Sequence, residues 1–189
     1  LFGGPDAASP NFNAVQRAVS FSMTSFITTG GIRGGKKQTG TFHPRSFNMG
    51  FHKDVFEKTG GFRLTRCGED IDFSILAIEN GFKSGLIHDA YVFHKRRTSI
   101  YQFFRQVKFF GKARVNIYTL HKKELKAVHL LPTAYTLYLI LSLLTVGFSL
   151  GKLWYILLPE FLFILLSFME SLFKNKNLKV ALLSIATSH

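Results

Sequence analysis

The stretch LLPTAYTLYLILSLLTVGFSL, residues Leu130–Leu150, contains no charged side chain. As a helix it would be about 30 Å long, which is enough to cross the hydrocarbon core of a bilayer. Pro132 falls in the first turn of this helix, where the missing N–H of proline costs little. The run therefore predicts a membrane-spanning helix over about residues 130–150.

A second apolar run, LWYILLPEFLFILLSFMESLF, follows at residues 153–173. It contains Pro159, Glu160 and Glu170, so it predicts either a second spanning helix or one that is kinked or lies in the membrane interface. After KNKNLK, the segment VALLSIATSH begins a possible third span. Two buried helices of a large soluble protein are the alternative to membrane helices.

Positive charge is concentrated before these runs, where 20 of the 24 Lys and Arg residues lie. We therefore expect a polar domain over residues 1–128 and a membrane region over residues 129–189. Basic segments flank the two runs on both outer sides, and the positive-inside rule then places these flanks and the polar domain in the cytoplasm. The formal charge of +13 indicates an anionic partner, such as nucleic acid, acidic lipid or a phosphate group.

Cys67 is the single cysteine, which excludes an internal disulfide framework and a zinc site made of several cysteines. The chain begins LFGGPDAASP, without an initiator methionine or the basic segment and apolar core of a signal peptide. We therefore expect it to be a piece of a longer protein.

Helical and extended patterns alternate along the polar part, which predicts an α/β fold. KDVFEKTGGF predicts a short helix closed by its two glycines, and GLIHDAYVFHK predicts one short apolar strand. In EDIDFSILAIENG the isoleucines recur at helical spacing and Gly81 is a natural end. The acidic residues Glu69, Asp70 and Asp72 therefore occupy the start of a helix.

The order of these elements resembles the C-terminal half of a membrane-attached family 2 glycosyltransferase of the GT-A fold. The resemblance covers roughly residues 42–150 and rests on GED at a helix start, VFHKRR after a strand, and QFFR on the helix before the spans. FGGPDAA is similar to the segment that follows the family's first metal-binding acidic motif. Neither that motif nor the nucleotide-binding strands before it are present, so we expect these 189 residues alone to be inactive.

The resemblance implies a function and a catalytic residue. The function is inverting transfer of a sugar from a nucleotide-sugar donor to a glycan or lipid-linked acceptor, with a divalent metal, Mn²⁺ or Mg²⁺, at the cytoplasmic membrane face. Asp70 would be the base that takes the proton of the acceptor hydroxyl as that oxygen attacks the anomeric carbon. Glu69 would orient the acceptor or a neighbouring cation. Asp72 has no assured counterpart, and we expect it only to favour the positive end of the helix dipole. Without the resemblance, all three acids are ordinary helix-start residues.

His94 would be a metal ligand by the same resemblance, and a neutral imidazole suits Mn²⁺ better than Mg²⁺. A solvated histidine at a strand end is the alternative. Gln102 and Arg105 belong to a segment similar to the family's Gln-x-x-Arg-Trp motif, with Gln106 in the place of Trp. Arg105 would hold the diphosphate leaving group as its negative charge grows.

Further substrate contacts are implied for Asn48, Arg96 and Arg97. The helix near residues 99–118 would lie at the membrane surface, or it could be a basic interfacial helix bound only to acidic lipid. The basic, glycine-rich segment Gly30–Lys37, GGIRGGKK, could fold over phosphates or be an exposed loop.

Two other classes of function remain beside the glycosyltransferase. A non-enzymatic membrane protein would bind anionic lipid or a partner through its basic face, and it predicts no cleft beside Glu69 and Asp70. Nucleic-acid binding is indicated by basic residues interleaved with phenylalanine, but the predicted spans argue against it, and we expect no nucleic-acid partner.

Overall fold

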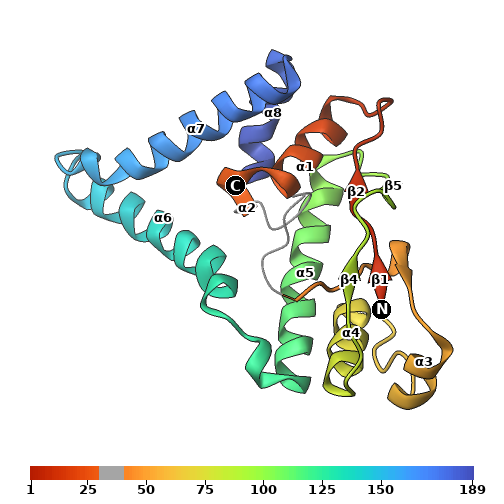
Figure 1. The fold of residues 1–189 in the computed structure, drawn as a ribbon. Coiled ribbons are helices and arrows are strands. Elements are labelled where there is room, and N and C mark those ends of the chain that lie inside the picture. The colour runs from red at the N-terminus through yellow and green to blue at the C-terminus, as the bar shows by residue number, and fades with distance from the viewer. Residues whose placement is uncertain (30–40) are drawn as a thin grey trace.

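The computed structural model describes residues 1–29 and 41–189, and the segment Gly30–Lys37 therefore lies outside the described residues. The described part of the chain is mostly helical (Figure 1). The strands are β1 Phe2–Gly3, β2 Asp6–Ala7, β3 Met49–Gly50, β4 Gly85–Leu86 and β5 Val92–Phe93. The α-helices are α1 Ala14–Thr24, α2 Phe26–Thr29, α3 Lys53–Thr59, α4 Glu69–Glu79, α5 Ile100–Leu120, α6 Leu131–Phe148, α7 Leu158–Asn175 and α8 Leu178–Ser188. Short 3₁₀ turns are η1 Ser46–Asn48, η2 Lys122–Glu124, η3 Ala127–Leu130 and η4 Trp154–Leu157.

The strands form two small sheets. β1 pairs antiparallel with β3 and parallel with β4, and β2 pairs parallel with β5. The predicted single strand over GLIHDAYVFHK is wrong, because a turn closed by the bond from Ala90 N–H to the Ile87 carbonyl separates β4 from β5. The alternation of helix and strand is present, but strands of two residues do not make the central sheet of a clear α/β fold.

The two short helices of the polar part agree with the prediction from sequence. α3 ends at Gly60, which has the left-handed conformation, and α4 begins at Glu69 and is followed by left-handed Gly81. α3 and α4 pack through a core that includes Val55, Phe73 and Ala77. This core fixes α4 on the strands and leaves its N-terminal end free to face α5.

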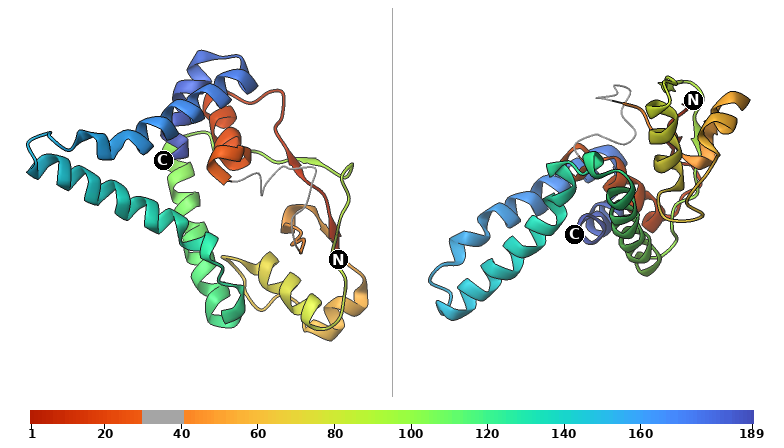
Figure 2. Two further views of the ribbon diagram at one scale, coloured as in Figure 1. Left: turned by 60° about the vertical axis from the view of Figure 1, so that its left-hand side comes forward. Right: turned by 90° about the horizontal axis from the view of Figure 1, so that it is seen from below.

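α5 runs through the centre of the molecule, with the strands on one side and the helices α6 and α7 on the other (Figures 1 and 2). Phe103 of α5 packs with Val19 and Met23 of α1. α1 in turn contacts α8, where the Thr187 hydroxyl donates to the Ala18 carbonyl at 3.2 Å. The segment predicted to begin a third span is therefore packed on α1 and α7 in this structure.

The structure has two helices that are long and apolar enough to cross a membrane, over Ala127–Phe148 and Trp154–Asn175. They form a hairpin that extends away from the rest of the chain (Figures 1 and 2). Only a small share of each is buried, 6% and 11% of the most apolar window, so most of their apolar surface is available to lipid. The two long apolar helices predicted from sequence are therefore present, and that they cross a membrane stays a prediction.

Both carboxylates of the second run have partners. Glu170 accepts hydrogen bonds from the Ser25 hydroxyl and from Phe26 N–H, and it pairs with Lys174 at 2.6 Å. Glu160 accepts a hydrogen bond from the Tyr135 hydroxyl of α6 at 2.6 Å. These bonds show how an apolar hairpin accommodates acidic residues, because each carboxylate contacts protein donors instead of lipid.

Candidate functional site

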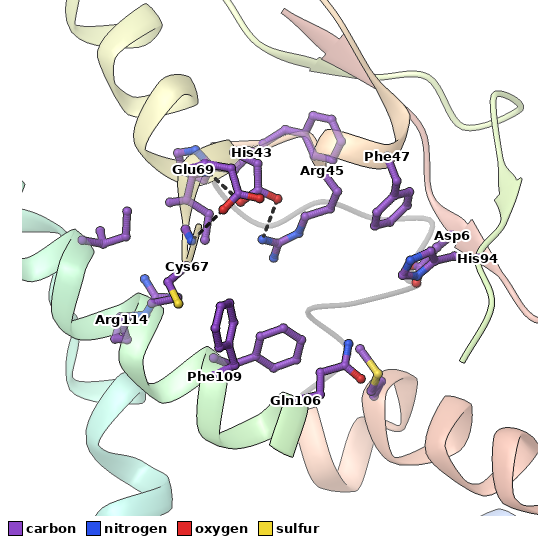
Figure 3. Close-up of a pocket in the computed structure, with 18 of the residues that line it drawn as sticks. Asp6, His43, Arg45, Phe47, Cys67, Glu69, His94, Gln106, Phe109 and Arg114 are labelled. Carbon is purple, nitrogen blue, oxygen red and sulfur yellow. Dashed lines mark hydrogen bonds and ion pairs between the residues drawn. The ribbon is translucent and has the colours of Figure 1, made fainter. Parts of the chain in front are cut away.

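A cavity of about 440 Å³ lies among the start of α4, the segment before β3, the region of β2 and β5, and α5 (Figure 3). Four of the residues predicted for the site line it: Glu69, Asp70, His94 and Arg96. The basic residues Arg45 and Arg114 and the imidazole of His43 line it as well, and sequence reasoning did not single them out. The lining therefore brings together residues far apart in the sequence.

Glu69 and Asp70 stand at the wall of this cavity because of a sharp turn before α4. Cys67 and Gly68 both have left-handed backbone conformations, with φ of 62° and 100°. The Asp70 carboxylate accepts from Ile71 N–H at 2.9 Å, and the Glu69 carboxylate accepts from Gly68 N–H at 3.1 Å. Both acids thus satisfy backbone donors at the positive end of the helix.

Asp70 also faces a cation across the cavity. Its Oδ2 lies 3.6 Å from Nη1 of Arg45, which reaches into the cavity from the segment before η1 (Figure 3). That separation is an ion pair and too long for a hydrogen bond. The side chain of Asp70 is 13% exposed, so the carboxylate is partly accessible to a ligand in the cavity.

The turn at Gly68 packs directly on α5. A Cβ added at Gly68 would lie 3.3 Å from side-chain carbons of Ile117, and Asn116 donates to the Cys67 carbonyl at 3.4 Å. Ile117 is almost fully buried. Because the contact is this close, a glycine at position 68 serves both the left-handed backbone and the approach of α5.

Asp72 does more than favour the helix dipole, and the expectation from sequence is wrong for this residue. Its side chain has no exposed surface, and its carboxylate contacts the Arg63 guanidinium and the His121 ring. Burial alone would raise the pKa of Asp72, but the hydrogen bonds from Arg63 and His121 outweigh burial and hold the pKa below its usual range. Asp72 is therefore a buried charge that joins three separate segments.

His94 lies at the other end of the cavity, stacked on Phe47 with ring centroids 4.1 Å apart (Figure 3). Burial lowers the pKa of His94, and the positive charges of Arg96 and Arg97 lower it further against the opposing effect of Asp6. Its Nδ1 is buried and has no hydrogen-bond partner in the described part of the chain. The ring is thus held mainly neutral at neutral pH, the form that a metal ligand requires.

The described residues do not by themselves form a metal site. Among residues 1–29 and 41–189, no group of three His, Cys, Asp or Glu side chains is close enough to hold an ion. Asp6 lies beside His94 in the cavity wall (Figure 3). Its carboxylate is paired with Arg96 at 2.6 Å. A metal bound at His94 would therefore need ligands besides these residues.

One face of α5 lines the cavity, and it is not the face predicted from the motif. Its lining residues recur at helical spacing and are Gln106, Phe109, Phe110, Ala113, Arg114 and Ile117. Gln106 stands where the family has Trp, and it does reach the cavity (Figure 3). Arg105 is exposed and does not line the cavity, because a neighbouring residue on a helix is rotated by about 100°.

Three other residues predicted to contact substrate also lie outside the lining. Gln102 accepts from the backbone and hydroxyl of Thr98 at 3.3 and 3.2 Å, next to the helix cap. Asn48 donates to the Ala90 carbonyl at 2.7 Å, and Arg97 is exposed. Their roles toward a substrate stay predictions.

The cations that sequence reasoning missed are close enough to affect one another. Burial lowers the pKa of Arg114, and the positive charge of Arg45 lowers it further. Burial also lowers the pKa of His43, and Arg45 and Arg114 add to this effect against the opposing influence of Glu124. The only sequence signal for Arg114 is its helical spacing from Gln106 and Phe110 on α5.

Comparisons with protein-family models, with curated proteins and with solved structures find no match to this chain. Any function must therefore be argued from the residues of the cavity and their chemistry.

Proposed function

We propose that this chain is part of an inverting glycosyltransferase of the family 2 type with a GT-A catalytic domain. The observation that carries the proposal is that Glu69 and Asp70, from the GED stretch, line a cavity of about 440 Å³ together with three arginines. A partly exposed carboxylate can act as a base toward a bound hydroxyl group. Cations beside it can stabilise an anionic leaving group. The family resemblance of GED and QFFR gives this arrangement its specific chemistry.

In the proposed reaction, Asp70 accepts the proton of an acceptor hydroxyl while that oxygen forms a bond to the anomeric carbon of the donor sugar. The bond from the anomeric carbon to the diphosphate oxygen breaks, and its electron pair leaves with the diphosphate. Attack from the opposite face inverts the anomeric centre. A carboxylate oxygen can accept the hydroxyl proton directly.

Glu69 sits beside the base and would orient the acceptor. The growing charge on the diphosphate would be balanced by the arginines of the cavity, and the predicted contribution of Arg105 belongs to this proposal although the residue is exposed in this structure. A divalent metal remains part of the proposal, with His94 as one ligand and further ligands supplied by other groups.

The partners follow from this chemistry. The donor would be a nucleotide sugar, and the acceptor a glycan or a lipid-linked sugar. The apolar hairpin supports a membrane location, which would bring a lipid-linked acceptor near the cavity. With both basic flanks in the cytoplasm, the reaction would take place at the cytoplasmic face.

A non-enzymatic membrane protein is the second candidate. It is favoured by the exposed stripe of α5, on which Tyr101, Phe104, Lys108 and Lys112 recur at helical spacing. Such a stripe suits an acidic membrane surface. That candidate predicts no cleft beside Glu69 and Asp70, and the cavity found there supports the enzyme instead.

The test uses the longer protein to which we propose this chain belongs. Membranes that contain it are supplied with a panel of radiolabelled nucleotide sugars, and label in glycan or lipid is counted. We expect transfer from one donor, and its loss in Asp70→Asn but not in Glu57→Gln, which alters an exposed acid on α3. Equal transfer by Asp70→Asn and the unaltered protein would remove Asp70 from the chemistry.

A further inference from the structure

Two arginines of the cavity carry positive charge without hydrogen-bonded anions. Arg45 has the ion pair with Asp70 at 3.6 Å, and its guanidinium makes no hydrogen bond to the described residues. Arg114 has neither a hydrogen bond nor an ion pair within residues 1–29 and 41–189. Residues 30–40 contain no Asp or Glu, so their side chains offer no carboxylate either.

The third arginine of the cavity shows the contrast. Arg96 is buried, and its charge is neutralised by the Asp6 carboxylate at 2.6 Å. At the end near His94 the charge of Arg96 is therefore neutralised. At the end near Asp70, the carboxylates of Glu69 and Asp70 line the wall, but neither Arg45 nor Arg114 has a hydrogen-bonded anion among the described residues. His43 belongs to this second end, and its Nδ1 is buried without a partner in the described part of the chain.

Partly buried cations of like charge are unfavourable unless an anion joins them. The pKa of Arg114 is lowered first by burial and then by the positive charge of Arg45, against the opposing effect of Glu124, which indicates that the two guanidinium groups repel each other. A ligand with two or more negative oxygens would relieve this repulsion. Guanidinium groups hold phosphate oxygens through pairs of parallel N–H bonds, which makes phosphate the chemistry that fits best.

We propose that Arg45 and Arg114 form a phosphate-binding subsite of the cavity, beside Asp70. Arg45 lies on the segment before η1 and Arg114 on α5, so the two groups approach the cavity from different walls (Figure 3). The proposal rests on the function proposed above in one respect: the phosphate belongs either to the diphosphate of the donor or to the phosphate of a lipid-linked acceptor.

The subsite has a consequence for the base. A phosphate bound to Arg45 competes with Asp70 for the same guanidinium, because the two are now joined only by a loose pair at 3.6 Å. Binding would therefore release the Asp70 carboxylate to face the acceptor hydroxyl. In this way the presence of a phosphate-bearing substrate would prepare the base.

The test measures binding and does not depend on turnover. The chain is purified in a neutral detergent with a chelator, so that only its basic side chains, and no metal ion, can bind an anion. It is then titrated in a calorimeter with inorganic pyrophosphate and with farnesyl phosphate. We expect Arg45→Gln and Arg114→Gln each to weaken binding about tenfold or more. Arg45→Lys and Arg114→Lys keep the charge without the fork and should give smaller losses.

Lys112→Gln is the matched control. It removes the same charge from the same helix, two residues before Arg114 and on the exposed face. It should change affinity less than about twofold, since screened surface charges contribute little. Equal weakening by Lys112→Gln and Arg114→Gln, or no weakening in any arginine variant, overturns the subsite. Melting temperatures of all variants show whether they are folded.

The two ligands separate the possible sources of the phosphate. Loss of pyrophosphate binding alone assigns the subsite to the donor diphosphate, and loss of farnesyl phosphate binding alone assigns it to the acceptor. If the unaltered chain binds neither pyrophosphate nor farnesyl phosphate, the subsite is overturned. The Asp70 test of the proposed function is then unaffected. Arginine-dependent binding together with an active Asp70→Asn enzyme would keep the subsite and reject the proposed function.

Discussion

Nε2 of His121 lies 2.8 Å from Oδ1 of Asp72, a carboxylate with no exposed surface. Asp72 belongs to the first turn of α4, and His121 follows α5 at the point where the chain turns toward the membrane hairpin. Arg63 completes the contact from the segment between α3 and α4. The helix that carries Glu69 and Asp70 is thereby tied to the segment that leads into the apolar hairpin of α6 and α7.

Asp72→Asn should be strongly destabilising. The amide loses the charged hydrogen bonds to Arg63, whose side chain is 41% exposed, and to the buried His121 ring. The loss of hydrogen bonds to a charged group costs about 1.5–3 kcal/mol of the free energy of unfolding. Chemical denaturation followed by circular dichroism in detergent measures this cost. Glu57→Gln is the control, because the pair of Glu57 with Lys53 at 2.8 Å is exposed and should contribute less than about 1 kcal/mol. Equal losses in the two variants would mean that the Asp72 contacts carry no special stability.

Gly68→Ala should cost more than Gly60→Ala. Both glycines have positive φ, 100° and 75°, so alanine at either is strained by about 1–2 kcal/mol. Only at position 68 would the added Cβ also meet Ile117, at 3.3 Å, whereas nothing lies within 4 Å at position 60. The excess destabilisation of Gly68→Ala should shrink when Ile117 is replaced by valine. An excess that survives Ile117→Val would show that the contact with α5 is not its cause.

Stability should fall as the pH is lowered from neutral. The pKa of His43 is lowered by burial, so below about pH 6.5 the unfolded chain binds more protons than the folded one. The stability that the neutral ring contributes is present above pH 6.5 and is lost as the pH falls toward the folded pKa. Melting temperatures between pH 7.5 and 5.5 should therefore decline less steeply in His43→Gln. An unchanged slope would remove His43 from this effect.

The topology of the hairpin can be tested with single cysteines. In a Cys67→Ser background, Lys152→Cys lies between the two spans and Lys123→Cys precedes the first. The positive-inside rule applied to the basic flanks predicts that position 123 lies in the cytoplasm and position 152 outside. A membrane-impermeant maleimide should label Lys152→Cys in intact cells and Lys123→Cys only after permeabilisation. Labelling of both positions in intact cells would contradict the predicted orientation.

Sequence reasoning succeeded where the signal is local. Helical spacing and glycine ends predict α3 and α4, and long apolar runs predict the two helices of the hairpin. The predicted helix near residues 99–118 corresponds to α5, Ile100–Leu120. Each of these elements is determined by residues within one continuous segment.

Sequence reasoning failed where tertiary packing decides. The rotation of α5 is fixed by Phe103 in the α1 core and by Ile117 against Gly68, and this rotation turns Gln106 and Arg114 into the cavity instead of Arg105. The partners of Asp72 lie 9 and 49 residues away, at distances that no spacing rule connects. Neither the rotation of α5 nor the partners of Asp72 could be predicted from sequence, because both depend on how the helices pack in three dimensions.

The central proposal is that Asp70 is the catalytic base, and the most direct test compares donor binding with turnover in the longer enzyme that we propose contains this chain. Calorimetry gives the affinity for the nucleotide sugar, and steady-state rates give kcat for the unaltered protein and for Asp70→Asn. We predict unchanged donor affinity and a kcat lowered by about a hundredfold or more, because the amide cannot accept the acceptor's proton. A folded Asp70→Asn enzyme that binds donor and turns over at the unaltered rate would contradict the account.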